Sequence, residues 1–181
     1  MRSDIMRQFA LVLTALLFAA GTPVLAESLH APMTLATPTG LGSSVGTITI
    51  TEGPSGATFV LDLHGLPAGA HGFHVHANPS CAPGEKDGKP VPAGGAGGHL
   101  DPAMTAMHLG PGGMGHLGDL PFLTVDADGT AKATLTTTRI KSLDALKGHA
   151  LMIHAGGDNY ADQPAPLGGG GARLACGVIG D

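Results

Sequence analysis

Glycine is the residue type that most restricts what this chain can fold into. It occupies 30 of 181 positions, whereas an ordinary protein has about 7% glycine. Each glycine inside a helix costs about 1 kcal/mol relative to alanine, so a fold built on long helices is excluded. The glycines have no three-residue period, which excludes collagen, and a hydrophobic content of 43% argues against general disorder. The remaining class is a loop-rich, all-β domain.

Short segments with the composition of strands are spread along the chain. Turn residues separate them, which predicts an antiparallel sandwich or barrel of about eight strands. Two long irregular stretches, 77–120 and 156–171, interrupt the pattern, and loops of that length inside a domain are usually functional. The expected strands are 47–51, 57–64, 72–76, 122–125, 130–137, 151–154 and 174–179.

The N-terminus has the pattern of a targeting segment. Arg2 and Arg7 precede an apolar run at 9–20, and small residues lead up to Ala26. This predicts a secretory signal peptide, residues 1–26, cleaved after Ala26, and a single domain at 27–181. The alternative is a membrane anchor, but a span needs about 20 apolar residues. We expect no membrane contact after cleavage, and a net charge of −5 gives no basic surface for nucleic acid.

The chain has two cysteines, Cys81 and Cys176. In an exported protein such a pair favours one disulfide bond. The loop between them is long, and the chain-entropy model gives roughly 4–5 kcal/mol for closing it. A cysteine metal site is the weaker alternative, because the sequence contains no CxxC pair.

Three of the ten histidines lie on expected strands in a pattern that suits a metal ion. His74 and His76 are separated by one residue, so both side chains lie on the same face of the strand. His154 ends another strand and is a candidate third ligand. Neutral imidazole suits copper, zinc, iron and nickel.

A second group lies within the first long loop: His99, His108, His116 and Asp119. Three imidazoles and one carboxylate complete a tetrahedral zinc site with no open position, which is the structural kind. Metal binding there would also order a glycine-rich loop, since the binding free energy contributes to folding.

Several motifs together resemble the copper/zinc superoxide dismutases, and most closely the exported bacterial branch. They extend over nearly all of the predicted mature chain, from about residue 46 to 179. The motifs are GFHVH at 72–76, GGHLDP at 97–102, HLGDLP at 116–121, AGGDN at 155–159, LGGGG at 167–171 and RLACGVI at 173–179. The resemblance implies an eight-stranded antiparallel Greek-key β-barrel with two long functional loops.

The resemblance also implies one copper and one zinc ion per subunit, with His99 bridging them. The implied copper ligands are His74, His76, His99 and His154. The implied zinc ligands are His99, His108, His116 and Asp119.

Four further residues have roles implied by the resemblance. Asp158 would link a copper histidine to a zinc histidine, and such outer groups orient metal ligands. Arg173 would guide an anionic substrate to the copper. Cys81 would pair with Cys176 and so anchor the long loop to the last strand.

The implied activity is that of a periplasmic superoxide dismutase, acting as a monomer or homodimer. Superoxide would be converted to O2 and H2O2 by alternating reduction and oxidation of copper, with zinc structural. The alternative reading of the same ligands is an exported protein that buffers copper and zinc without turnover. A buffer needs neither Arg173 nor a bridging His99.

Overall fold

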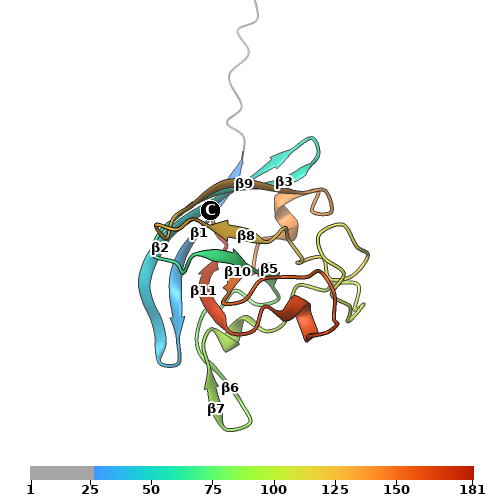
Figure 1. Ribbon diagram of the computed structural model, residues 1–181. Coiled ribbons are helices and arrows are strands. Elements are labelled where there is room, and N and C mark those ends of the chain that lie inside the picture. Colours follow the sequence, from blue (N-terminus) through green and yellow to red (C-terminus); the bar gives the residue numbers. More distant parts are fainter. Residues whose placement is uncertain (1–26) are drawn as a thin grey trace, which may run out of the picture.

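The computed structural model describes residues 27–181, so the predicted signal peptide at 1–26 lies outside the described residues. The described chain consists of strands, loops and three short 3-10 helices (Figure 1). The helices are η1 (Gly94–Ala96), η2 (Leu143–Ala145) and η3 (Pro166–Gly169). None of the helices found in residues 27–181 is long and apolar enough to cross a membrane.

Seven strands form one curled antiparallel sheet in the order β5-β10-β11-β1-β2-β3-β9. Strands far apart in the chain are paired, for example β3 with β9 and β1 with β11. The strands of this sheet are β1 (Ser28–Thr37), β2 (Gly40–Gly53), β3 (Gly56–Leu63), β5 (Phe73–His76), β9 (Ala131–Thr137), β10 (Ala150–His154) and β11 (Arg173–Val178). The predicted all-β antiparallel class is confirmed.

Two short strand pairs complete the fold. β4 (Gly69–His71) pairs with β8 (Leu123–Val125), and β6 (Gly84–Lys86) pairs with β7 (Lys89–Val91). The predicted number of eight strands is therefore approximate. The β6–β7 hairpin lies inside a stretch that the sequence predicts to be irregular, and its turn has Asp87 and Gly88 at positive φ.

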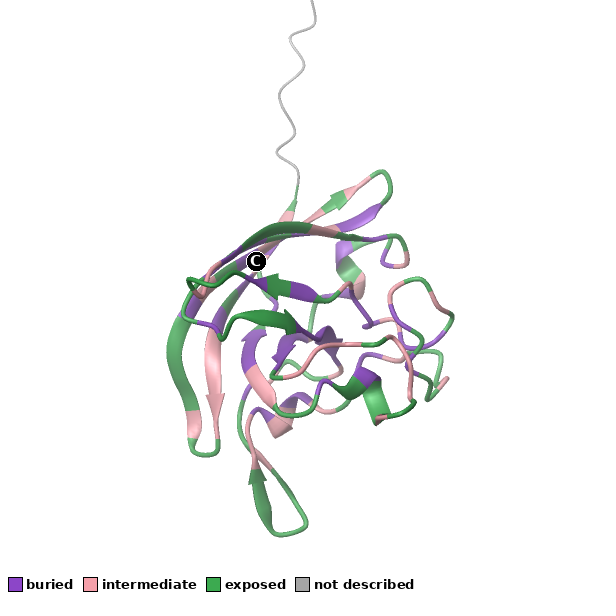
Figure 2. Ribbon diagram, in the orientation of Figure 1, coloured by how far each residue is buried: buried purple, intermediate pink, exposed green. Residues whose placement is uncertain are grey.

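The core lies inside the curl of the sheet, and burial follows the period of two along parts of β1, β2 and β3 (Figure 2). In the β2–β3 pair, Ile48 is opposite Leu61 and Ile50 is opposite Phe59, and all four are buried. Phe59 meets Phe73 edge to face at 5.8 Å between ring centroids. This small pair supplies the aromatic part of the core, as the low aromatic content of the chain leads one to expect.

Strand β1 is the element that the sequence analysis missed. Leu29, Ala31 and Met33 alternate into the core from it, and it pairs with β2 along most of its length. Pro32 lies in the middle of the strand and has no amide hydrogen, which weakens the strand signal. The pairing register shifts next to Met33, just beyond this proline.

The long loop before β8 is fastened to β5 by main-chain contacts. Leu100 N–H donates to Val75 O, Val75 N–H donates to Gly118 O, and Gly118 N–H donates to Leu100 O, at 2.8 to 2.9 Å. A Cβ on Gly118 would lie 2.2 Å from Val75 O, so only glycine allows this approach. The loop is thereby held against the strand that carries His74 and His76.

Candidate metal centre

The backbone brings histidines from separate elements to one place. His74 and His76 lie on β5, a strand that is buried along its whole length. The loop fastened to β5 forms isolated bridges that place His99 opposite His76 and Asp119 opposite His74. His154 ends β10, which is paired with β5. Residues separated by as many as 80 positions therefore share one buried site.

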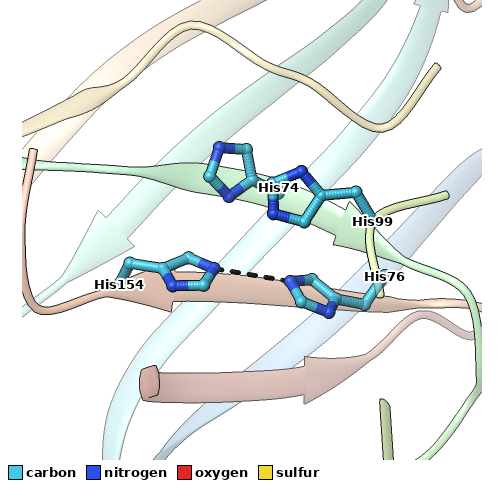
Figure 3. A group of neighbouring side chains, drawn as sticks. All are labelled: His74, His76, His99 and His154. Carbon is cyan, nitrogen blue, oxygen red and sulfur yellow. Dashed lines mark hydrogen bonds between the residues drawn. The ribbon is translucent and has the colours of Figure 1, made fainter. Parts of the chain in front are cut away.

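Four imidazoles form the first group of potential ligands, drawn in Figure 3: His74, His76, His99 and His154. Their donor nitrogens all lie within 4.8 Å of one another. The Nε2 atoms of His76 and His154 are 3.4 Å apart, and the rings of His74 and His99 stack at 4.0 Å between centroids. Such an all-imidazole set suits a transition metal like copper.

Asp119 is the centre of the second group. Its Oδ1 lies 3.0 Å from Nδ1 of His99, 3.0 Å from Nδ1 of His108 and 3.4 Å from Nδ1 of His116. His99, His108 and Asp119, together with His74, have donor atoms within 4.8 Å of one another. His116 lies outside that tighter set and is the most loosely placed of the predicted zinc ligands.

Four buried ring nitrogens have no hydrogen-bond partner within the described residues. They are His74 Nδ1, His99 Nε2, His108 Nδ1 and His116 Nδ1. Buried polar atoms without a partner are rare in proteins and need an explanation. Metal ligation explains these unpartnered nitrogens, because those of His74 and His99 belong to the first group and those of His108 and His116 to the Asp119 cluster. The residues therefore fit a nitrogen site for copper beside a tetrahedral site for zinc.

Asp158 links the two groups by hydrogen bonds to one histidine of each. Its Oδ2 accepts a hydrogen bond from His74 Nε2 and its Oδ1 accepts one from His108 Nε2, each at 2.8 Å. Tyr160 N–H also donates to Oδ1 at 2.8 Å. These bonds turn the free Nδ1 atoms of both histidines toward the sites, which is how outer carboxylates orient metal ligands.

Three of the four rings of the first group favour the neutral form. Burial lowers the pKa of His99 to about 4 and that of His154 to about 3, and neighbouring histidines lower the pKa of His154 further. Burial, reinforced by the charge of His99, also brings the pKa of His76 well below its usual value. At neutral pH these rings therefore keep a free lone pair, which a metal ligand requires.

The second group differs because it contains carboxylates. Burial opposes a charge on His108, but the close carboxylates of Asp119 and Asp158 outweigh it and raise the pKa of His108 to about 9. Burial also opposes the charges of Asp119 and Asp158. The close contact of each carboxylate with His108 outweighs that burial and holds the pKa of both carboxyls below the usual range. This half of the centre therefore binds a proton that a metal must displace.

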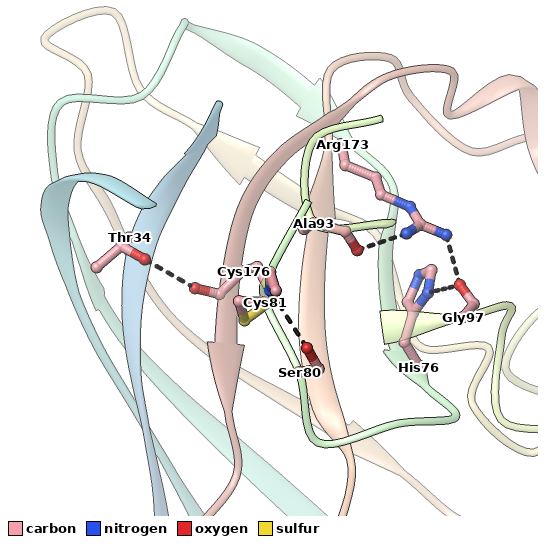
Figure 4. The surroundings of a disulfide bond; sticks show 9 residues. Thr34, His76, Ser80, Cys81, Ala93, Gly97, Arg173 and Cys176 are labelled. Carbon is pink, nitrogen blue, oxygen red and sulfur yellow. Dashed lines mark hydrogen bonds between the residues drawn. A yellow bond between two sulfur atoms is a disulfide. The ribbon is translucent and has the colours of Figure 1, made fainter. Parts of the chain in front are cut away.

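Arg173 and the disulfide lie on the side of the centre near His76 (Figure 4). The Cys81–Cys176 disulfide is present as predicted. Cys176 lies on β11 three residues after Arg173, whose guanidinium donates to Ala93 O at 2.6 Å and to Gly97 O. Gly97 O also accepts from His76 Nδ1 at 2.9 Å, so the half-buried arginine lies next to a potential copper ligand.

Two residues near the centre were missed by the sequence analysis. Tyr160 donates from its N–H to Asp158 and accepts from Phe122 N–H through its hydroxyl at 3.1 Å. Arg139 donates to the carbonyls of Gly115 and His116 at 3.0 and 2.7 Å. No motif or spacing connects either residue with the histidines, so no local signal in the sequence could have found them.

Comparisons with known proteins agree with this geometry. The model of the family described as copper/zinc superoxide dismutase (SODC) matches residues 44–179. A Cu-Zn superoxide dismutase of Brucella abortus is 57% identical over 157 residues, which are 87% of this chain and 91% of that protein. One of Escherichia coli is 53% identical over 174 residues, 96% of this chain and 99% of that protein.

Solved structures show the same likeness. The Cu/Zn superoxide dismutase from Brucella abortus superposes with a TM-score of 0.83 at 57% identity, over 84% of this chain and 99% of that one. The monomeric enzyme from Salmonella enterica gives a TM-score of 0.76 at 57% identity, with the same coverage. Because the family model matches residues 44–179, which is most of this chain, the chain belongs to the copper/zinc superoxide dismutase family.

Proposed function

We propose that residues 27–181 form an exported superoxide dismutase, which turns two superoxide anions and two protons into O2 and H2O2. The observation that carries the proposal is His99, whose Nδ1 faces Asp119 while its Nε2 has no partner among the described residues and faces the other histidines. A ring shared in this way can bridge two metals. A protein that only stored metal ions would need no such bridge.

The residues divide into two halves around His99. The copper half consists of His74, His76 and His154. The zinc half consists of His108, His116 and Asp119. When bound, copper supplies the one-electron chemistry that oxidises one superoxide and reduces the next, and zinc, which has no redox chemistry, supplies charge and loop order.

Arg173 provides the positive charge that an anionic substrate needs. The chain has a net charge of −5, which repels superoxide at long range. A half-buried guanidinium beside His76 gives a local attraction, and local fields can overcome the sign of the net charge. Arg173 therefore binds and orients the anion, with its own position set by Ala93 O and Gly97 O.

His99 holds a proton close to the substrate. Its Nδ1 is directed to Asp119 and the zinc half. If zinc were held at Nδ1, the ring would have only Nε2 free to bind a proton, and Nε2 faces the copper half. This nitrogen is therefore the protein atom that we assign to deliver a proton to the reduced product.

Export is part of the proposal. Residues 1–26 are proposed as a signal peptide directing the chain to the periplasm, and the Cys81–Cys176 disulfide suits an oxidising compartment. Each subunit carries a complete set of ligands, so the proposal holds for a monomer and for a homodimer.

A direct test combines metal analysis with a superoxide decay assay on purified protein. We expect one copper and one zinc per chain, and a decay rate that rises in proportion to the concentration of the metallated protein. We also expect removal of zinc alone to change the copper EPR spectrum, because both metals share His99. Stoichiometric binding of both metals without faster superoxide decay would favour the buffer protein instead.

A further inference from the structure

Arg139 connects the barrel to the loop that carries the zinc half. It lies between β9 and η2, 23 residues away from His116 in the sequence. Its Nη1 donates to His116 O at 2.7 Å and its Nη2 donates to Gly115 O at 3.0 Å. Two parallel donors on adjacent carbonyls use the planar fork of a guanidinium, which lysine cannot reproduce.

Arg139 itself stands on a rigid part of the barrel. Thr137 and Ile140 on either side of it are buried. Ile140 O accepts a hydrogen bond from Ala57 N–H on β3 at 2.8 Å, and Thr137 O passes so close to Gly56 that a Cβ there would lie 2.2 Å away. The backbone that carries Arg139 is therefore fixed by the strands and not by the loop.

His116 needs such support more than the other zinc-half residues do. The rings of His99 and His108 are hydrogen-bonded to Asp119 and Asp158, and Asp119 accepts from Leu109 N–H. Among residues 27–181, the Nδ1 atom of His116 has no hydrogen-bond partner, and Asp119 Oδ1 lies 3.4 Å from it. What holds His116 is its backbone, through its N–H to Met107 O at 3.0 Å and its carbonyl to Arg139.

We propose that Arg139 is a positioning residue for the zinc ligand His116. By fixing the carbonyls of His116 and Gly115 to the barrel, it keeps the His116 imidazole turned toward Asp119. Arg139 orients His116 through its backbone, whereas an outer carboxylate such as Asp158 orients a ligand through its ring. The inference rests on the proposed zinc site.

The test measures zinc affinity by competition with a chelator on the copper-loaded protein, for wild type, R139Q and R139K. Substitution of groups that orient a ligand typically weakens metal binding about 10–100-fold, which we expect for R139Q. We expect R139K to recover part of this, because an ammonium can donate to one carbonyl. Co²⁺ in place of zinc gives a second readout, since its visible absorption reports tetrahedral geometry and should change in R139Q.

Lys141→Gln is the matched control. Lys141 lies two residues away, and its ammonium donates to Ser55 O at 3.2 Å, away from the metal loop. We expect K141Q to bind zinc and cobalt as wild type does. Wild-type zinc affinity and cobalt spectrum in R139Q would overturn the inference, as would an equal loss in K141Q.

Two further outcomes keep the test decisive. If R139Q does not fold, R139K carries the test: weaker zinc binding than wild type supports the inference and equal binding overturns it. Failure of the wild-type protein to bind zinc would instead refute the proposed zinc site. The two failures are therefore distinguishable.

Discussion

The two halves of the metal centre are built in different ways. The copper half lies on strands, with His74 and His76 on β5 and His154 on β10, and strand pairing places these residues. The zinc half lies on a glycine-rich loop, where polar contacts do this work. Asp162 accepts from His108 N–H at 2.9 Å and Arg139 donates to His116 O. The barrel thus preforms one half, whereas the other depends on the contacts of a loop and, we propose, on the metal.

His99 is the residue that we propose as a ligand of both halves. His99→Ala removes a ligand from each half, and we expect more than about a 100-fold loss of activity, because even an outer-shell substitution costs about 10–100-fold. Superoxide decay and metal content measured together check this. His64→Ala is the control, since His64 is exposed on the barrel. Retention of both metals by the His99→Ala protein would contradict the proposal that the two metals share His99.

Removal of zinc should affect the stability of the two halves differently. Hydrogen exchange on the zinc-free protein should show loop amides at 98–119 losing most of their protection while β5 and β10 keep theirs, because loops open at much lower free energy than core strands. Loops that remain as protected as in the zinc-bound protein would show that the zinc half is also preformed.

Asp158→Asn tests the link between the halves. An amide can accept through its oxygen from only one of the two rings, so either His74 or His108 loses its partner. We expect zinc affinity to fall about 10–100-fold and copper affinity to fall less, because His74 is held by β5. Asp128→Asn in an exposed turn is the control. An equal loss of both metals would show that strand placement gives the copper half no advantage.

The pH dependence of metal binding should differ between the halves. With its pKa raised to about 9, His108 is protonated at neutral pH and must release that proton to bind zinc. Zinc affinity should therefore fall about tenfold for each pH unit below 9. The pKa values of His99 and His154, about 4 and 3, leave these two rings neutral between pH 6 and 9. Calorimetry in buffers of different ionisation enthalpy counts the protons, and their absence on zinc binding would contradict this.

Much of the centre was predictable because its signals are local. The period of two in β5 predicted His74 and His76 on one side, and the sequence predicted the strands at 47–51 and 57–64, where Ile48, Ile50 and Phe59 are buried. The disulfide followed from the number of cysteines and the expected export. Strand β1 was missed because a proline interrupts its pattern.

The sequence by itself determined the all-β class, the residue types of the proposed ligands and, apart from the β6–β7 hairpin and short 3-10 helices, the two irregular loops. Composition and strand periodicity are local properties that folding cannot change. Only the tertiary structure decided how the loop reaches β5 through Val75 and Gly118, and that Arg139 holds the backbone of His116. These contacts join residues many positions apart through carbonyl groups, which every residue possesses. The residue types along the chain therefore do not indicate which carbonyl a distant guanidinium will contact.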